Sequence, residues 1–178
     1  MQNEPERALV DAAVGGDIES FGELCRRYYP AIVAVAYAVL SDHQLAEDAA
    51  QESFARALVN LRRLKNRGRF APWLAAICRN VAKDMVATKA RHISTEDPSR
   101  IARDDSDDED NRAIRQAIEH LPDAAKELIV LRYYNNLSYE RIAAILGISP
   151  AAINGRLLRA KQKMAKYLKR TGFPESQL

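Results

Sequence analysis

The sequence is poor in the residue types that bind metals or form catalytic clusters. It has two cysteines and three histidines in 178 residues. Cys25 and Cys78 show no CxxC spacing and have no histidine partner at ligand spacing, so we predict buried, reduced thiols and neither a zinc site nor a redox motif. His43, His92 and His120 are scattered near the ends of predicted elements. We therefore expect no enzymatic activity, no metal and no cofactor.

Long apolar runs are also absent. No run approaches the roughly 20 residues that are needed to span a bilayer. No basic N-terminal segment precedes an apolar stretch of the kind that forms a signal peptide. We therefore expect a cytoplasmic protein.

Glycine and proline are scarce and fall mostly between long stretches of Ala, Leu, Arg, Lys and Glu. The chain has seven of each, while 47% of its residues are hydrophobic and 29% are charged. This mixture is typical of a globular protein, and the residues that fill the long stretches favour helices. We predict an all-α fold.

Charge is strongly segregated along the chain, although the net charge is only +3. Residues 62–91 and residues 132–170 each carry nine cations against one acid, a net charge of +8, whereas residues 96–110 carry −6. The acidic stretch lacks helical periodicity and is too polar to bury a core. We therefore predict two small helical domains, at 1–92 and 111–172, joined by a flexible acidic linker at 93–110 and followed by a tail at 173–178.

Breaker and capping residues divide the N-terminal domain into helices. The glycine pair at 15–16 is expected to end a first helix, and Asp17 to cap the second. Pro30 suits the first turn of a separate apolar helix. Apolar residues at spacings of three and four then predict a long helix over residues 45–64 and a last helix from Phe70.

The C-terminal domain carries the pattern of a helix-turn-helix motif. Asp123 is expected to cap a helix that reaches Tyr134. After the next short helix, Gly147 suits a left-handed turn, and Ser149 and Pro150 suit the N-cap and first turn of the last helix. Two helices joined by such a tight turn form a helix-turn-helix.

The last helix has an apolar stripe and, about 120° away around its axis, a basic stripe. Small residues at its start would let the first turn approach base edges in a major groove, while the cations contact bases or phosphates. A basic helical face is usually only solvated, but its position after a helix-turn-helix favours DNA contact here. The residues of this face are Ser149, Ala151, Ala152, Gly155, Arg156, Arg159 and Lys163.

A second basic face lies on the helix that begins at Phe70. Asparagine can hydrogen-bond an unpaired base edge, cations can hold the phosphates of a single strand, and the preceding polar loop can close over a flipped base. Taken alone, such a face is more often a solvated surface. Trp73 is expected in the core. The candidate residues are Lys65, Asn66, Arg67, Arg69, Arg79, Asn80 and Lys83.

Acidic residues on the long helix indicate a different kind of partner. Asp48, Gln51 and Glu52 lie opposite its apolar stripe. An acidic face in a basic protein favours a protein partner rich in Arg and Lys, because nucleic acid is repelled there. Paired carboxylates also suit acid–base or metal chemistry, but no histidine or third ligand lies at a helical offset from them.

Sequence motifs occur in both domains. The N-terminal domain has DHQLAEDAAQESFARA from residue 42 and FAPWLAAICRNVAKD from residue 70, and the C-terminal domain has LPDAAKELIVLRYY from residue 121, LSYERIAAILGIS from residue 137 and RLLRAK from residue 156. The first two motifs resemble sigma region 2, and the others sigma region 4, of the extracytoplasmic-function (ECF) subfamily of bacterial sigma-70 factors. The resemblance covers nearly the whole chain apart from the linker and the tails.

The resemblance implies an alternative sigma factor that directs core RNA polymerase to promoter DNA. It implies that an acidic surface, formed by Asp48, Gln51 and Glu52, binds the clamp helices of the polymerase β′ subunit. The seven candidates at positions 65–83 become a −10 surface that melts and reads the −10 element, and the seven at positions 149–163 become a −35 surface. The β flap and an anti-sigma factor are further implied partners, and no small-molecule substrate is implied.

One motif departs from the family pattern, because Ala152-Ile-Asn-Gly replaces a Thr-Val-Lys-Ser-like run at the start of the last helix. The −35 sequence therefore cannot be transferred from relatives. Two other interpretations remain open. One is an autonomous helix-turn-helix regulator that binds an operator as a dimer, which tight binding to duplex DNA without polymerase would favour. The other is an interaction protein that sequesters another regulator.

Overall fold

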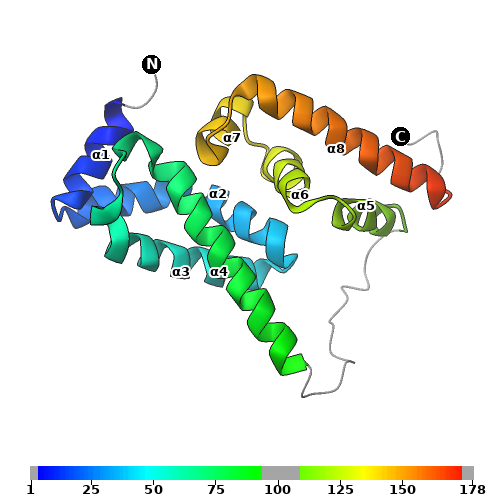
Figure 1. Ribbon diagram of the computed structural model, residues 1–178, viewed down its shortest axis with the longest axis horizontal. Coiled ribbons are helices and arrows are strands. Elements are labelled where there is room, and N and C mark those ends of the chain that lie inside the picture. The colour runs from blue at the N-terminus through cyan, green and yellow to red at the C-terminus, as the bar shows by residue number, and fades with distance from the viewer. Residues whose placement is uncertain (1–3, 94–108, 174–178) are drawn as a thin grey trace.

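The computed structural model describes the backbone of residues 4–93 and 109–173 and the side chains of residues 6–91 and 111–173. The described residues form eight α-helices with short 3₁₀ and π-helical segments, and they contain no strand (Figure 1). The all-α prediction is confirmed. Within this part of the chain, no helix has both the length and the hydrophobicity of a membrane span.

The helices form an N-terminal module and a C-terminal module. The N-terminal module contains α1 Glu4–Val14, α2 Ile18–Leu40, α3 His43–Asn60, η1 Leu61–Arg63, η2 Arg67–Arg69 and α4 Phe70–Ile93. The C-terminal module contains α5 Glu109–Glu119, α6 Asp123–Ile129, the π-helical segment η3 Val130–Tyr134, α7 Tyr139–Leu146 and α8 Pro150–Arg170.

Helices α2, α3 and α4 pack against one another in the N-terminal module, with α1 against α2. The Asp17 side chain caps α2 by accepting a hydrogen bond from the Glu19 N–H at 3.0 Å, as predicted. Asp42 caps α3 in the same way through the Leu45 N–H. The apolar stripe predicted for the long helix is buried, and it comprises Ala50, Phe54, Ala57, Leu61 and Leu64.

The prediction that Pro30 begins a separate helix is wrong, because α2 is continuous through it. A proline inside a helix costs about 3 kcal/mol relative to alanine, since it removes a backbone hydrogen bond. The neighbouring Tyr28 and Ile32 are both fully buried, whereas Pro30 is exposed. Burial of the flanking side chains thus offsets the local cost, and the proline lies on the solvent side of the helix.

The helix-turn-helix prediction is confirmed. Gly147 ends α7 with a φ of 68°, and the Ser149 side chain accepts a hydrogen bond from the Ala152 N–H at 3.2 Å, with Pro150 in the first turn of α8. The predicted capping role of Asp123 is wrong, because α6 begins at that residue and Pro122 is its N-cap. The Pro122 carbonyl accepts the backbone hydrogen bonds there, so no side-chain cap is used.

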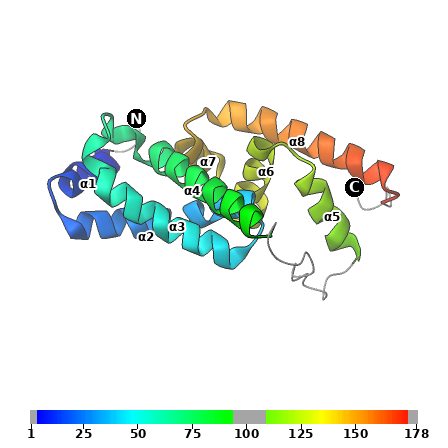
Figure 2. The ribbon, with the colours of Figure 1, turned by 60° about the horizontal axis from the view of Figure 1, so that its bottom comes forward.

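The two modules pack against each other through one continuous core. Helix α2 contacts α6 and η3, and α4 contacts α7. The ribbon shows α6 and α7 between α8 and the N-terminal module (Figures 1 and 2). Most of the predicted acidic linker, residues 94–108, lies outside the described residues. Its predicted last residues, Glu109 and Asp110, belong to α5.

Candidate functional site

The acidic surface lies on α3. Asp48, Gln51 and Glu52 are all exposed, while the intervening Ala49 and Ala50 are fully buried against the neighbouring helices. Asp48 and Gln51 make no hydrogen bond or ion pair with any residue that the structure describes. Glu52 accepts a hydrogen bond from Arg56 at 2.7 Å, and Arg56 also reaches Asp84 of α4 at 3.6 Å. The three predicted residues are therefore available on one face.

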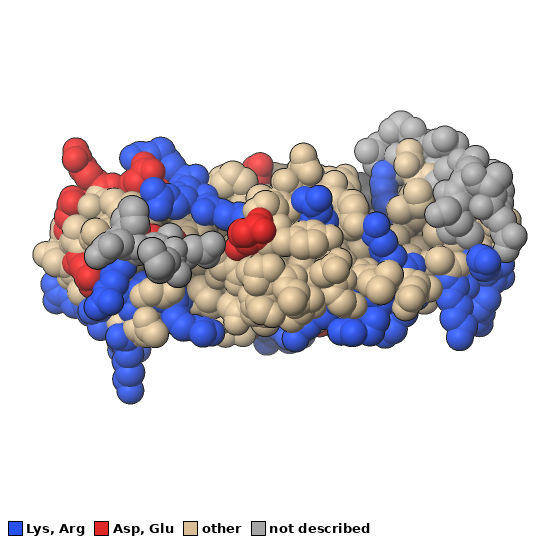
Figure 3. Space-filling model, turned by 90° about the horizontal axis from the view of Figure 1, so that it is seen from above, with Lys and Arg blue, Asp and Glu red and all other residues tan. Residues whose placement is uncertain are grey.

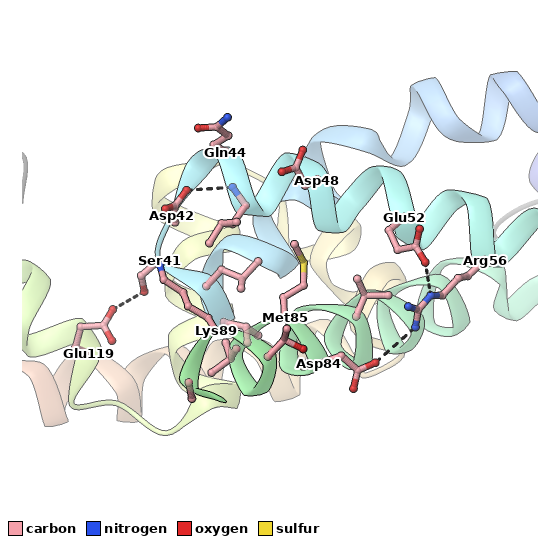
Figure 4. A pocket seen from close by; sticks show the side chains of 17 residues that line it. Ser41, Asp42, Gln44, Asp48, Glu52, Arg56, Asp84, Met85, Lys89 and Glu119 are labelled. Atoms are coloured by element: carbon pink, nitrogen blue, oxygen red, sulfur yellow. Dashed lines mark hydrogen bonds and ion pairs between the residues drawn. The ribbon is translucent and has the colours of Figure 1, made fainter. Parts of the chain in front are cut away.

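A groove of about 1160 Å³ runs beside the acidic surface, between α3 and α4. The close-up shows Met85 reaching from α4 towards α3 and the carboxylates of Asp48 and Asp84 on opposite sides (Figure 4). The groove therefore combines apolar side chains with an acidic rim. Its apolar residues include Val39, Leu40, Leu45, Val81, Met85 and Val86. Its charged residues are the acidic Asp42, Asp48, Glu52, Asp84 and Glu119 and the basic Arg56 and Lys89.

A small pocket of the N-terminal module borders the −10 surface at Asn80. The pocket has a volume of about 290 Å³. Asn80 is exposed beside it, and the half-buried Trp73 forms part of its wall, packed against the Phe70 ring at 6.0 Å between ring centroids. Trp73 thus has one side on the core, as predicted, and another on the pocket. The lining residues are Arg56, Asn60, Arg63, Trp73, Ile77 and Asn80.

The loop residues of the −10 surface differ in their contacts. Lys65 is exposed and makes no hydrogen bond or ion pair with a described residue. The Asn66 side chain accepts a hydrogen bond from the Gly68 N–H at 3.1 Å. The Arg67 guanidinium donates to the carbonyls of Leu61 and Leu64, and its Nε lies 3.4 Å from an Asp11 carboxylate oxygen. Arg67 therefore holds the loop in place in this conformation.

Arg79 of the −10 surface makes a two-pronged ion pair with Glu127 of α6. Its Nε lies 3.1 Å from both carboxylate oxygens, and its Nη2 lies 2.9 Å from Oε1. Side-chain exposure is 11% for Glu127 and 31% for Arg79. Burial raises the pKa of Glu127 above its ordinary value, although the Arg79 hydrogen bonds oppose this shift. The exposed Lys83 has no such partner among the described residues.

Sequence reasoning missed Glu127. A signal existed, because the four apolar residues that follow it, 128–131, are consecutive. A helical segment that is apolar all round is covered on more than one side. All four are buried, so α6 packs within its own module and also against α2. The charged residues beside this run were therefore candidates for burial with a partner.

The −35 surface is solvent-facing at the start of α8. Ala151, Arg156, Arg159 and Lys163 are exposed, together with the N-cap Ser149, while Ala152 and Gly155 are partly exposed. The three cations make no hydrogen bond or ion pair with a described residue. Seen from above, Lys and Arg side chains line the part of the surface where α8 lies, whereas acidic residues gather mainly at the α1 end (Figure 3).

Residues of the two predicted DNA surfaces meet at a pocket between the modules. It has a volume of about 310 Å³. Arg79 and Lys83 of the −10 surface line it together with Arg156 of the −35 surface, and α6 contributes the carboxylates of Asp123 and Glu127. Residues that the sequence assigned to separate promoter elements are thus close neighbours in this conformation.

Four further contacts join the modules. Arg141 of α7 donates a hydrogen bond to the Arg27 carbonyl at 2.6 Å, and its guanidinium lies 4.7 Å from the centroid of the Tyr28 ring. The Ser41 hydroxyl donates to Glu119 at 2.7 Å. The rings of Tyr37 and Tyr134 stack at 5.5 Å. Helix α7 also approaches α4 closely at Gly147, where a Cβ atom would lie 2.9 Å from Arg69 Nη2 and 3.3 Å from Pro72 Cγ.

Neither cysteine is placed for reactivity. Cys78 is fully buried, and burial raises the pKa of its thiol to about 11. Cys25 is half-buried, so the prediction of a buried thiol holds only in part for it. Within the described residues, no three His, Cys, Asp or Glu side chains are grouped as a metal site would require.

Comparison with known proteins agrees with this arrangement. Residues 24–92 match the family Sigma-70 region 2, and residues 111–164 match the family Sigma-70, region 4. The chain is 32% identical to the RNA polymerase sigma factor CarQ of Myxococcus xanthus and 31% identical to the ECF RNA polymerase sigma factor SigW of Bacillus subtilis. Each alignment covers 86% of this chain and 91% of the relative. The chain belongs to the ECF sigma factors.

Another relative is much longer than this chain, and two solved structures share its fold at lower sequence identity. The "Probable RNA polymerase sigma factor RfaY" of Xanthomonas campestris pv. campestris is 31% identical, and this ECF sigma factor spans only 42% of its length. The fold is similar to CnrH in complex with the cytosolic domain of CnrY, with a TM-score of 0.59 at 23% identity over 93% of this chain and 97% of that chain. It is also similar to RpoE of Bartonella quintana in complex with the anti-sigma factor NepR, with a TM-score of 0.52 at 24% identity over 85% and 98%.

The family determines the general function. The protein is an alternative sigma factor that acts in promoter-specific transcription initiation. Both sigma regions are present in the expected order, and this does not favour the operator-binding dimer. Sigma factors are initiation factors rather than catalytic enzymes.

Proposed function

We propose that this ECF sigma factor binds core RNA polymerase through the acidic surface of α3 and the groove beside it. The proposal rests mainly on the observation that Asp48 and Glu52 border a large apolar groove whose rim carries five acidic side chains against two basic ones, Arg56 and Lys89. Such a surface suits a helical partner with an apolar face flanked by Arg and Lys. The β′ clamp helices are the partner that the family resemblance implies, and the polymerase supplies all catalysis. We place this assembly in the cytoplasm.

The two basic surfaces would then read the promoter. The −10 surface combines exposed cations with a pocket lined by Trp73 and Asn80, and this chemistry suits an unstacked base and the phosphates of one strand. The −35 surface presents a helix N-terminus with small residues and the free cations Arg156 and Arg159, which suits a major groove. We assign residues 1–92 to region 2, 93–110 to a linker and 111–172 to region 4, with the β flap binding beside the −35 surface.

An anti-sigma factor is the proposed regulatory partner. CnrH and RpoE, which share the fold, are both described in complexes, with the cytosolic domain of CnrY and with the anti-sigma factor NepR. The groove beside the acidic surface is the site where a regulatory helix would compete directly with polymerase.

Charge reversal on α3 tests the polymerase site. We expect Asp48→Arg with Glu52→Arg to abolish association with core polymerase in a pull-down, because the arginines would face the cationic side chains of the partner. The matched control is Glu19→Arg with Glu140→Arg, which reverses two exposed carboxylates away from α3 and should leave association unchanged. Unchanged association of the α3 variant would refute the assigned surface.

Transcription in vitro tests the remaining assignments. Purified core polymerase, with and without this protein, would be supplied with genomic fragments, and the transcript start sites would reveal the promoters. We expect sigma-dependent transcripts with common sequences near −35 and −10. Tight, specific binding of the free protein to duplex DNA, with no sigma-dependent transcript, would contradict the proposal.

A further inference from the structure

We propose that α6 covers the −10 surface of the free protein, with the Glu127 carboxylate in the position of a DNA phosphate on Arg79. The two modules would therefore have to separate before this sigma factor reads promoter DNA. The inference rests on the proposed function of the −10 surface, and it adds an internal competitor for that surface.

The geometry of the Arg79–Glu127 pair supports this competition. An arginine binds a carboxylate and a phosphate through the same forked N–H donors, so both ligands cannot hold it together. Here both carboxylate oxygens of Glu127 are engaged, and the pair is largely shielded from solvent. A phosphate would therefore have to displace a buried carboxylate.

The pocket between the modules shows that α6 covers more of the −10 surface than Arg79 alone. Lys83 lines this pocket with Arg79, and the pocket also contains the carboxylate of Asp123. Two carboxylates of the C-terminal module thus lie next to two cations of the −10 surface. The acidic edge of α6 supplies the negative charge that a nucleic-acid strand would otherwise bring.

The length of a promoter shows that this conformation cannot be the promoter-bound one. The −35 and −10 elements lie about 25 base pairs apart, which is about 85 Å along B-form DNA at 3.4 Å per base pair. Arg156 of the −35 surface and Arg79 of the −10 surface line one pocket of about 310 Å³. A single promoter cannot reach both residues here, so binding requires that the modules move apart.

Contacts without a predicted DNA role hold the modules together. Arg141 anchors α7 to the Arg27 carbonyl and the Tyr28 ring. The Ser41–Glu119 hydrogen bond and the Tyr37–Tyr134 stack join α2 to the C-terminal module. These contacts can be removed without changing either DNA surface.

The acidic surface remains accessible in this closed conformation. Asp48, Gln51 and Glu52 are exposed, and the groove beside them is open to a partner. Polymerase can therefore bind the closed protein, whereas a DNA phosphate would first have to displace Glu127 from Arg79. This asymmetry gives an order of assembly in which polymerase binds first and promoter DNA second.

The decisive variant is Arg141→Ala in the full chain. Small-angle X-ray scattering would measure the radius of gyration, and fluorescence anisotropy would measure binding to a labelled mixed-sequence single strand of about 12 nucleotides. We expect a larger radius of gyration and about tenfold tighter binding, because the binding-competent fraction rises. Simple electrostatics predicts the opposite, since the variant has lost a cation.

Two matched variants separate opening from charge. Arg170→Ala removes an exposed cation at the far end of α8 and should keep the protein compact, with unchanged or weaker strand binding. Glu127→Arg should open the protein through repulsion of Arg79. Combining it with Arg79→Glu restores an opposite-charge pair and should restore compactness, which a merely unfolded variant would not do. Circular dichroism would check that the helices remain.

The outcomes distinguish this inference from the proposed function. A wild-type protein as extended as Arg141→Ala would overturn the closed state. A compact wild type, with an opened Arg141→Ala that binds the strand no more tightly, would overturn the cover. The −10 assignment itself is tested separately in the assembled holoenzyme, where Lys83→Ala should weaken promoter opening whether or not the free protein is closed.

Discussion

The two predicted DNA surfaces differ in whether their arginines already have partners within the protein. Arg79 of the −10 surface is held by Glu127 in a shielded pair. Arg156 and Arg159 of the −35 surface are exposed and form no ion pair with a described residue. In the sequence, each surface is a basic stripe on a helix, and the two stripes resemble each other. The difference shows that the neighbouring module decides whether a cation is available for DNA. Four changes would test this comparison.

The largest effect is expected at the free arginines. Arg156→Ala with Arg159→Ala should lower transcription from −35-dependent promoters by tenfold or more, because each lost contact to DNA is worth about 1–3 kcal/mol. The melting temperature should stay nearly unchanged, since both side chains are exposed and neither forms a hydrogen bond or ion pair with a described residue. In vitro transcription and thermal unfolding would measure the two effects. Normal transcription from such promoters would remove these residues from the −35 surface.

Arg79→Ala, in contrast, should lower the stability of the protein. It leaves Glu127 buried without its partner, which costs about 1–3 kcal/mol in the closed conformation. We expect a lower urea midpoint for the closed state of the free chain. Lys83→Ala is the control, because Lys83 is an exposed cation of the same surface without an ion-pair partner in the described structure. Equal stability of the two variants would show that the pair contributes nothing to closure.

A smaller, stabilising effect is expected at Gly155, which lies inside α8. An added Cβ there would meet only Arg159 Nη1, at an ordinary contact distance of 3.7 Å. Gly155→Ala should therefore raise stability by about 0.5–1 kcal/mol, measured by thermal unfolding. Gly22→Ala in α2 is a matched change in the other module, with Arg26 Nη1 at 3.8 Å. A destabilised Gly155→Ala would reveal a contact that the helix now avoids.

The smallest effect is a dependence of closure on pH. Burial raises the pKa of Glu127 in the closed protein, so this form binds the proton more tightly than an open form with an exposed carboxyl. Closure should strengthen as pH falls from neutral towards the raised pKa. Arg79, Asp123, Lys83 and Arg156 are the charged groups around it. The radius of gyration should follow this trend in the wild type but not in Glu127→Gln.

The pKa of Glu119 is shifted in the opposite direction from that of Glu127, to a lower value. Burial alone would raise its pKa, but hydrogen bonds from Lys126 and Ser41 outweigh burial and lower it. Its contribution is therefore present above the ordinary pKa of 4.5 and is lost as pH falls through the lowered value. The free energy of unfolding should therefore fall in strong acid, because the Lys126 and Ser41 hydrogen bonds to the Glu119 carboxylate are lost. A free energy of unfolding that does not fall in strong acid would mean that these hydrogen bonds do not stabilise the protein.

The local parts of the fold could be predicted because their signals are local. Asp17, Gly147 and Ser149 act within one helical turn, and each adopts the predicted role. Pro30 was misjudged because its local cost is offset by burial against distant helices. Asp123 was misjudged because a backbone carbonyl, which every residue has, replaced the side-chain cap.

The packing of the two modules against each other could not be predicted from sequence patterns. Arg79 and Glu127 are 48 residues apart, and helical periodicity shows which residues share a face but not which face meets which. The sequence distinguished an acidic surface from two basic ones, and the assignment of residues to these surfaces remains a prediction. The carboxylates that line the pocket beside Arg79 come from α6, 48 residues away in the chain for Glu127.

The position of Trp73 provides a built-in optical probe. It is the only tryptophan in the sequence, and it lines the pocket that contains Asn80. Its emission therefore reports on one known place, without any label or substitution. A base that enters the pocket would stack near the indole and quench the signal, while events at α8 would leave it unchanged. Rapid-mixing fluorescence can thus time the arrival of the melted strand separately from duplex contact.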